Sequence, residues 1–311
     1  ADWAQSTADV VNGRKVRYPG WDLDEVFFTT QVTETAVITL AVAPDNAYEA
    51  IARQIDHAQS SIHIQTLTIE SIAISEALIR AAQRGVSVTL LLEGGPAGGL
   101  TDQEKYICQQ IEQATGACWF MINDTAAHIY DRYSFMHAKF MLLDDQWAII
   151  SSQNLSPDSL PDDDKSDGTW GRRGVVLITD APTVVQHIQS LLAYDGDPAH
   201  HADIARWMPT ADWLPPPGYV PITVTGGITY AVRFPEPTAF TGEFPLEIVQ
   251  SPENSLRDVD GLLGLVNRAG QGDKVWVEQL YERPYWGPTA SGTPSTDPNP
   301  RLEAYIAAAR R

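Results

Sequence analysis

Segments with the alternation of a β-strand take turns with segments of helical spacing through most of this chain. Strand patterns at 37–42 and 62–67 are interleaved with helical patterns at 46–58 and 74–85. The run VSVTLLLEG at 86–94 is apolar almost throughout, as in a strand that is buried on both faces of a sheet. Strands that alternate with helices of this length predict an α/β fold, in which a mixed β-sheet is flanked by helices.

The same alternation continues further along the chain. The pattern predicts a helix over 102–116, strands over 135–144, 147–151 and 174–180, and a further helix over 181–195. These elements define a first lobe over residues 37–205, preceded by an amino-terminal arm over residues 1–36. Residues 206–245 are rich in Pro, Trp and Thr, and we interpret them as a linker with short strands.

The last part of the chain repeats the beginning of the first lobe. Three features return in the same order: Pro-Asp-Asn at 44–46 as Pro-Glu-Asn at 252–254, the strand pattern at 62–67 at 275–280, and the helical pattern at 75–84 at 302–311. Residues 246–311 are therefore predicted to start a second, similar lobe. This lobe is incomplete because the chain ends before a counterpart of the strand at 86–94, and an unfinished sheet leaves backbone hydrogen bonds unmade. We expect the rest of the lobe in another segment or another chain.

The charge balance bears on the class of partner. The chain of 311 residues has 21 Lys and Arg against 40 Asp and Glu, a formal net charge of −19, and only five of the basic residues are lysine. Such a surface repels polyanions, so binding of nucleic acid through its phosphates is disfavoured. No apolar run reaches the roughly 18 residues of a membrane-spanning helix, and the amino terminus lacks the pattern of a signal peptide.

Two cysteines, Cys108 and Cys118, flank a predicted helix end and the strand that follows it. This layout is compatible with a disulfide and equally with two buried thiols. Together with the few lysines and the nine tryptophans, the pair favours a secreted or extracytoplasmic location.

Five polar residues interrupt the two apolar strands predicted between 135 and 151 or follow them directly. They are His137, Lys139, Asp144, Ser152 and Asn154. Residues two apart on a strand point to the same side, so His137 and Lys139 are expected to share a face, and Ser152 and Asn154 likewise. An imidazole beside a fixed ammonium suits attack on a phosphate diester. The cation holds the phosphate oxygens while the nitrogen displaces the leaving alcohol.

Other histidines have simpler interpretations. A single histidine in an apolar strand is usually packed and hydrogen-bonded, and we interpret His63, His128 and His187 in this way. His200 and His201 lie in a polar loop and are interpreted as solvated. A single lysine beside an Asp-Asp turn is usually a surface charge, but five polar residues at fixed offsets favour a site.

This arrangement resembles the signature of the phospholipase D superfamily, His-x-Lys-x4-Asp-x6-Gly-Ser-x-Asn, and departs from it only at Ser151, where glycine is usual. The passage AAQRGVSVTLLLEG also looks like that family's segment before its central strand. The resemblance covers roughly residues 37–200 and, as the beginning of a second copy, residues 246–311. It implies a phospholipase D-like lobe and a site shared between two such lobes, either fused or dimerised.

The resemblance also implies a role for each residue. His137 would be the nucleophile that forms a phosphohistidine, or the general acid, with a histidine of the other lobe in the complementary role. Lys139 and Asn154 would hold phosphate oxygens, and Ser152 would support the site. Asp144 belongs to the same candidate set, with a structural hydrogen-bonding role favoured over direct participation. No metal or other cofactor is implied, because cationic side chains supply the charge stabilisation and the sequence has no clustered His/Cys ligand set.

One stretch departs from the family. Many members have a Glu shortly before the strand that corresponds to 174–180, where it can orient a catalytic imidazole. Here Arg172 and Arg173 occupy that stretch. Either another acid takes this part, with the acidic run at 162–164 as a candidate, or the arginines face the phosphate. Such a run is otherwise a solvated surface charge.

The expected function follows from this resemblance. The chain is expected to be a metal-independent phosphodiesterase or phosphatidyltransferase of phospholipase D type, acting on phospholipids through a phosphohistidine. A nuclease of the same superfamily and a catalytically silent binding lobe are the alternatives. Nucleic acid is the less favoured partner because of the negative charge, and peripheral contact with a membrane fits a lipid substrate.

A second imidazole is also expected. The attacking His137 and the leaving oxygen lie on opposite sides of the phosphorus, so one histidine cannot easily serve both. A homodimer of the first lobe would leave residues 246–311 unfinished. We therefore expect a complementary polypeptide, or a continuation of this one, that carries its own His-x-Lys motif.

Overall fold

The computed structural model describes residues 9–11, 14–16, 27–96, 98–133, 135–251, 254–255, 257–279, 282–285, 293 and 295–311. The chain divides into two compact units, and each is treated by itself. One unit is Glu34–Phe244, called the main unit, and the other combines Ala1–Thr33 with Pro245–Arg311. The main unit holds the predicted first lobe and most of the predicted linker.

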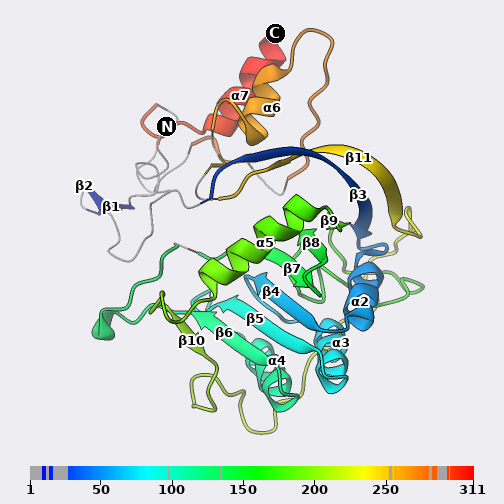
Figure 1. Cartoon of the computed structure of the whole chain (residues 1–311), viewed down its shortest axis with the longest axis vertical. Coiled ribbons are helices and arrows are strands. Elements are labelled where there is room, and N and C mark those ends of the chain that lie inside the picture. The colour runs from blue at the N-terminus through cyan, green and yellow to red at the C-terminus, as the bar shows by residue number, and fades with distance from the viewer. Residues whose placement is uncertain are drawn as a thin grey trace. The chain divides into compact units, whose positions relative to one another are not determined.

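A mixed β-sheet forms the centre of the main unit (Figure 1). Its described strands are β3 (Thr30–Ala43), β4 (Ser61–Thr66), β5 (Ser87–Glu93), β6 (Ala117–Met121), β7 (Lys139–Leu143), β8 (Trp147–Ser151), β9 (Gly174–Thr179), β10 (Ile204–Arg206) and β11 (Thr238–Ile248). Their order across the sheet is β10-β6-β5-β4-β7-β8-β9-β3-β11. β4, β5 and β6 run parallel, whereas β7, β8, β9 and β3 join by antiparallel pairing. A separate ribbon pairs β1 (Asp9–Val11) with β2 (Arg14–Val16).

Helices cover both faces of this sheet (Figure 1). α2 (Ala47–His57), α3 (Ile72–Gln83) and α4 (Asp102–Gln113) pack on one face over a fully buried core of Ile, Leu and Ala side chains. α5 (Pro182–Asp195) covers β7 and β8 on the other face, and a single 3-10 turn, η1, spans Thr125–Ala127. The predicted α/β class is confirmed.

The second half of β5 is buried on both of its faces, as the apolar run predicted, whereas Ser87 is exposed and Thr89 is partly buried. Leu90 and Leu92 are completely buried against the helices, and Leu91, which points to the opposite side, is only 5% exposed. Side-chain caps fix the starts of the helices that flank this strand in the sequence. The Ser71 hydroxyl accepts the N–H of Ile74, and the Thr101 hydroxyl accepts the N–H of Glu104, both at 3.2 Å.

One edge of the sheet collects the ends of several strands. α3 and α4 begin shortly after β4 and β5 end, and the antiparallel β7 starts beside the end of β4, where Lys139 pairs with Thr66. β8 returns to the same edge, because Phe140 near the start of β7 pairs with Ile150 near the end of β8. We call this the site edge: the ends of β4, β5 and β8 together with the start of β7.

Two expectations about strands are wrong. The strand predicted over 135–144 begins only at Lys139, since the segment before it has no continuous ladder to a neighbouring strand. The strand predicted over 275–280 is absent from 275–279. A strand needs a neighbour for its backbone N–H and C=O groups, and no described strand pairs with this segment. Leu280, like residues 252–253 of the repeat, lies outside the described residues.

Local structure does repeat around two asparagines. Asn46 Oδ1 accepts the N–H of Val42 at 2.9 Å, and Asn254 Oδ1 accepts the N–H of Gln250 at 2.7 Å. In each case the asparagine N–H also donates to the carbonyl four residues earlier, at 2.9 and 3.1 Å. Both side chains are buried. Among the described residues, two helices follow the second turn, α6 (Gly261–Arg268) and α7 (Pro300–Arg310), and α7 contains most of the helix predicted at 302–311.

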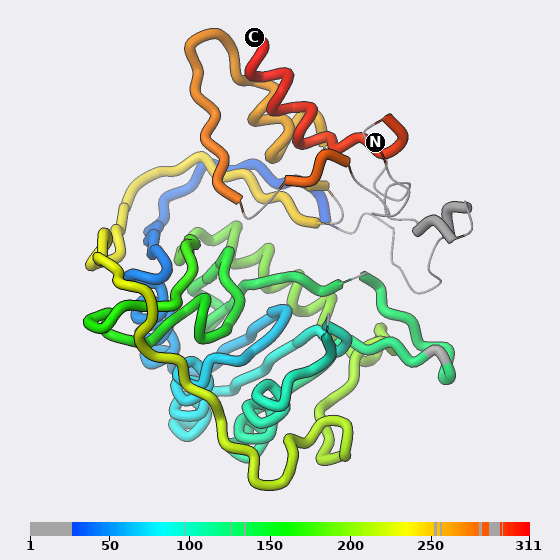
Figure 2. The backbone as a smooth tube through the Cα atoms, turned by 180° about the vertical axis from the view of Figure 1, so that it is seen from behind, coloured from blue at the N-terminus to red at the C-terminus, as the bar shows by residue number. Residues whose placement is uncertain are grey.

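The predicted linker has little regular structure between β10 and β11. It is the yellow-green segment that runs along the outside of the main unit in Figure 2. The Gln103 side chain fixes it through two hydrogen bonds with the Ile222 backbone, at 2.7 and 3.0 Å. An isolated bridge between Thr169 and Ile228 fixes it further along. Among the described residues, no helix has the length and apolar content that spanning a membrane requires.

Cys108 in α4 and Cys118 in β6 are completely buried and are free thiols. Burial, and then a hydrogen bond with Cys118, raises the pKa of Cys108 well above its ordinary value. The two sulfur atoms are therefore neighbours inside the core, at the helix-to-strand connection that the sequence indicated.

Candidate active site

His137 and Lys139 lie together at the site edge. Lys139 is the first residue of β7 and is partly buried, while His137 stands just before the strand and is exposed. Lys139 Nζ donates to the carbonyl of His137 at 3.0 Å. An ammonium has three donors, so this bond leaves further N–H groups of Lys139 for a ligand. The expected shared face does not come from strand alternation, because His137 is outside the strand.

The surroundings shift the pKa of both groups downward. Burial lowers the pKa of Lys139 to about 8. Partial shielding from water, and then the charge of Lys139, lowers the pKa of His137 below its ordinary value of 6.5, although the side chain as a whole is exposed. No carboxylate of the described residues is among the groups that shift the pKa of His137. The imidazole is therefore mostly neutral at neutral pH, which is the form that can attack phosphorus.

Ser152 and Asn154 follow the end of β8 at the same edge. The Ser152 hydroxyl accepts the N–H of Val175 at 2.9 Å and donates to its carbonyl at 3.3 Å, which ties β8 to β9. Because both residues lie beyond the strand, the alternation that predicted a shared face does not apply to them. Ser151, where the family usually has glycine, ends β8, and its hydroxyl accepts the N–H of Gln153 at 2.8 Å.

Asn154 carries a buried polar atom that is not satisfied. Its Oδ1 has no hydrogen-bond partner within the part of the chain that the structure describes. The next residue is firmly held, since the carbonyl of Leu155 accepts the N–H groups of Glu70 and Ser71 at 2.7 and 2.8 Å. A buried acceptor without a partner costs about 1–3 kcal/mol, and the amide nitrogen of the same side chain is the group that can donate to a phosphate oxygen.

Asp144 lies at the other end of β7 from Lys139. A five-residue step along a strand spans about 16 Å. The Asp144 carboxylate accepts the N–H groups of Gln59, Ser60 and Ser61 at 2.7–3.1 Å and the Ser60 hydroxyl at 2.8 Å. Although burial opposes its ionisation, these hydrogen bonds lower the pKa of Asp144 below its ordinary value. The position and the bonds fit the structural role rather than participation in the chemistry.

Both arginines that replace the family's usual Glu have acidic partners. Arg172 forms an ion pair with Asp158 at 2.5 Å. Arg173 donates to the Tyr230 hydroxyl at 2.8 Å and lies 3.8 Å from Asp45, whose side chain is completely buried. These partners weaken the alternative that the arginines face the phosphate.

The acidic run at 162–164 has partners of its own. Asp163 lies 3.6 Å from the buried Lys165 Nζ. Asp164 is exposed and accepts the N–H of Ser166 at 2.9 Å. None of the three carboxylates of the run is among the groups that shift the pKa of His137, so this candidate for the missing acid also lacks support.

Four of the remaining histidines, His63, His128, His200 and His201, lie in settings that differ from the predicted ones. His128 is exposed on a turn with φ 57°, so it is not packed in a strand. His200 forms an ion pair with Asp197, with 2.5 Å between Nδ1 and Oδ2, and the His201 ring packs edge-on against Tyr194. His63 lies in β4 and is only partly buried, because it lines a cavity.

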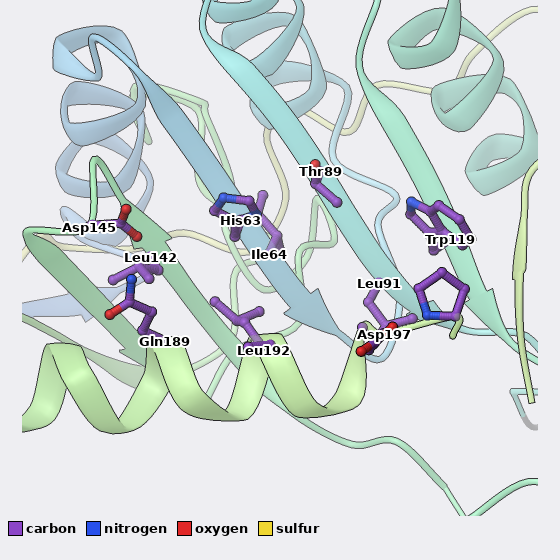
Figure 3. A pocket seen from close by; sticks show the side chains of 13 residues that line it. His63, Ile64, Thr89, Leu91, Trp119, Leu142, Asp145, Gln189, Leu192 and Asp197 are labelled. Carbon is purple, nitrogen blue, oxygen red and sulfur yellow. The ribbon is translucent and has the colours of Figure 1, made fainter. Parts of the chain in front are cut away.

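That cavity is separate from the site edge. It holds about 530 Å³ between α5 and the strands β4, β5 and β6, and Figure 3 shows His63, Thr89 and Trp119 on its sheet side with Gln189 and Leu192 on its helix side. None of the five motif residues lines it. Within the described residues, no group of three or more His, Cys, Asp and Glu side chains is arranged to hold a metal ion.

A residue that the sequence analysis did not select also lies at the site edge. Glu93 ends β5, is 6% exposed, and accepts the N–H of Met136, the residue before His137, at 2.8 Å. A carboxylate at the end of a strand that is buried on both faces was the signal in the sequence. A carboxylate at such a position needs hydrogen-bond donors, because it is buried together with the strand end.

Comparison with known proteins agrees with the motif. Residues 51–195 match the family model described as cardiolipin synthase, PLD-like domain. The search of curated proteins found no match. Among solved structures, the phospholipase D family member Nuc from Salmonella typhimurium is 15% identical, with 55% of this chain and 98% of that chain covered and a TM-score of 0.43.

Two further solved structures are similar at the same level. NucT from Helicobacter pylori is 18% identical over 52% of this chain and 93% of its own, with a TM-score of 0.38. Phosphatidylserine synthase from Haemophilus influenzae Rd KW20 is 12% identical over 55% of this chain and 40% of its own, also with a TM-score of 0.38. At such identities no residue role is taken from these proteins.

Proposed function

Because residues 51–195 place this chain in the phospholipase D superfamily, we propose that it is a phosphodiesterase or phosphatidyltransferase in which His137 forms a phosphohistidine. The observation that carries the proposal is the pair at the start of β7. A histidine whose pKa is lowered lies beside a partly buried lysine with donors to spare. A neutral nucleophile and a cation at one phosphorus are what this displacement requires.

The reaction proceeds in two displacements. A nitrogen of His137 bonds to phosphorus while the bond from phosphorus to the leaving alcohol breaks, and the departing oxygen takes a proton from a facing imidazole. That imidazole then accepts a proton from water or from an alcohol, whose oxygen attacks phosphorus and releases His137. Lys139 and the Asn154 amide hold the phosphate oxygens throughout. Ser152 supports this edge by keeping β8 joined to β9.

The facing imidazole belongs to a second lobe. Phospholipase D-like proteins often have two lobes or form dimers. The matching hydrogen bonds of Asn46 and Asn254 support residues 246–311 as the start of such a lobe. A complementary polypeptide, or further sequence of the same one, supplies the second His-x-Lys motif.

The substrate is a phospholipid rather than a nucleic acid. The net charge of −19 opposes the approach of a polyanion, and the matching family model is described by a lipid-synthesising activity. The test is an assay of the complete protein on phosphatidylcholine, phosphatidylglycerol and single-stranded DNA, without added metal. We expect turnover of lipid, whereas cleavage of DNA alone would assign the nuclease alternative.

A catalytically silent binding lobe is the alternative from another class. A silent lobe keeps the fold, but its binding does not require a lowered pKa of His137. We expect His137→Ala to abolish turnover while the thermal melting temperature stays unchanged, since His137 is exposed. A wild-type protein that binds phospholipid with no turnover would favour the silent lobe.

A secreted or extracytoplasmic location is part of the proposal. Cys108 and Cys118 are close enough to form a hydrogen bond in the core. Mass spectrometry of protein purified from its native host without reductant tests this location, because a disulfide between Cys108 and Cys118 would show that the protein matured in an oxidising compartment. Two free thiols would argue against an oxidising compartment.

A further inference from the structure

The backbone in front of His137 is held by a buried carboxylate. Glu93 Oε2 accepts the N–H of Met136 at 2.8 Å, and Glu93 Oε1 accepts the N–H of Gly95 at 2.9 Å. Met136 itself is 2% exposed. The carboxylate thus joins the end of β5 to the residue that precedes the nucleophile.

This bond is one of several that fix an otherwise irregular segment. The carbonyl of Ala138 accepts the N–H of Leu67 at 3.1 Å, just after His137. Further upstream, the backbone N–H and the Nε of Arg132 both donate to Asp203 Oδ2 at 2.9 Å, and Arg132 is 5% exposed. Among the described residues between Arg132 and Ala138, the backbone hydrogen bond nearest to His137 on its amino-terminal side is the one from the Met136 N–H to Glu93.

The turn after β5 explains why the carboxylate reaches this place. Gly94 donates its N–H to the carbonyl of Met121 at 2.8 Å, and a Cβ on Gly94 would lie 2.1 Å from that oxygen. Only glycine fits there, so the chain turns sharply against β6. The turn brings the N–H of Gly95 to one oxygen of Glu93 and leaves the other oxygen for Met136.

Burial makes the arrangement costly without its partners. Burial raises the pKa of Glu93, and the hydrogen bonds from Met136 and Gly95 oppose that effect. Both hydrogen bonds are short, at 2.8 and 2.9 Å, and the loss of either would leave a buried oxygen without its partner. Each therefore restrains the backbone more than an ordinary loop contact does.

We propose that Glu93 is a positioning residue for the displacement at phosphorus, acting through the backbone of Met136 on the place of His137. The inference rests on the proposed function. Lys139 donates to the carbonyl of His137, so the nucleophile and its neighbouring cation are set by the same short backbone stretch. A shift of this stretch moves both with respect to the phosphate.

The test compares Glu93→Gln with Glu112→Gln in the complete protein. Glu112 makes the same kind of bond, since it accepts the N–H of Cys118 at 2.8 Å, but it lies beside the start of β6, away from the site edge. A glutamine at 93 can accept only one of the two N–H groups. We expect kcat to fall about tenfold to hundredfold with KM nearly unchanged, while Glu112→Gln keeps its kcat. Glu93→Asp, which keeps the charge on a shorter side chain, is the second variant if the amide does not fold.

A second readout separates this inference from the proposed function. Hydrogen exchange of the Met136 amide should be slow in the wild type and faster in Glu93→Gln, whatever reaction the protein performs. Unchanged exchange, or a kcat equal to that of Glu112→Gln, overturns the role of Glu93. A wild type without any phosphodiester turnover overturns the proposed function instead, and the exchange measurement still decides whether Glu93 holds the segment.

Discussion

At the start of β7, Lys139 donates one hydrogen bond, to the carbonyl of His137, whereas at the end of the strand both carboxylate oxygens of Asp144 accept hydrogen bonds from the backbone. Both residues belong to one sequence motif. The pKa of Lys139 is lowered, which favours its neutral form. The pKa of Asp144 is also lowered, which favours its charged form. At one end of this short strand Lys139 therefore has N–H groups left for a ligand, and at the other end both oxygens of Asp144 already accept hydrogen bonds.

This difference shows how to divide a motif into chemistry and support. A buried cation without a counter-ion destabilises the fold and is retained where a ligand supplies the missing charge. A carboxylate that closes a turn through several N–H groups stabilises the fold and has little left for a substrate. The cation should lower the free energy of unfolding and the carboxylate should raise it, and both contributions can be measured.

Replacement of Lys139 should give the largest effect. Lys139→Met removes the cation that holds the phosphate and should lower kcat/KM by about 10²–10³-fold. It should also raise the free energy of unfolding at pH 7, because the folded pKa of about 8 lies below the ordinary 10.5 and the unfolded chain binds more protons between these values. The gain should shrink as the pH rises from about 8 to 10.5. Chemical denaturation at several pH values measures it.

The control for this variant is Lys105→Met on α4, at a position that is also partly exposed. It should leave turnover unchanged. A Lys139→Met protein that is less stable than the wild type at pH 7 would mean that Lys139 supports the fold, and the contrast between the two ends of β7 would fail.

Replacement of Asp144 should have the opposite sign. Asp144→Ala loses the hydrogen bonds from Gln59, Ser60 and Ser61, and should lower the free energy of unfolding by about 2–4 kcal/mol. Turnover per folded molecule should stay within about threefold at temperatures below the transition. The carboxylate stabilises the fold above its ordinary pKa of 3.8, and this contribution is lost as the pH falls through its lower folded value.

Asp145→Ala is a matched control for Asp144→Ala. The two residues share the left-handed backbone, with φ 55° and 53°, so both variants carry the same strain. The difference between them isolates the hydrogen bonds. Equal losses of stability would assign the effect to the turn and not to the carboxylate.

The pH dependence of turnover should reflect the start of β7. The value of kcat/KM should fall above pH 8 as Lys139 loses its proton, and fall at low pH as His137 becomes protonated, below its ordinary pKa of 6.5. Measurements from pH 4 to 10 in buffers of constant ionic strength test both limits. The part of the fall that belongs to Lys139 should be missing in Lys139→Arg, because arginine keeps its proton, whereas deprotonation of the facing imidazole affects both proteins alike. An unchanged upper limit in that variant would assign the titration to another group.

The sequence predicted the sheet, its helices and the motif, because strand and helix periodicity and residue spacing are local properties. It did not predict where β7 begins, since that depends on the pairing of Lys139 with Thr66, far away in the sequence. The bounds of β8 were predicted, but Ser152 and Asn154 lie beyond its end, so strand alternation does not decide whether they share a face. Glu93 was overlooked because its partner, Met136, is brought to it only by the fold.

Ser152→Ala should give the smallest effect. It tests whether a residue at the site edge supports the fold, as Asp144 does, or contacts the phosphate, as Lys139 does. The Ser152 hydroxyl lies at the site edge but is already bonded to the Val175 N–H and carbonyl. Its loss should lower the free energy of unfolding by about 0.5–1 kcal/mol and raise KM by a few fold at most, with kcat unchanged. Ser190→Ala removes an exposed hydroxyl that bonds to the Gln186 carbonyl in α5 and serves as the control. A large fall in kcat for Ser152→Ala alone would indicate that the Ser152 hydroxyl contacts the phosphate directly. A hydroxyl that only joins β8 to β9 makes no interaction that becomes stronger in the transition state, so its loss should leave kcat unchanged.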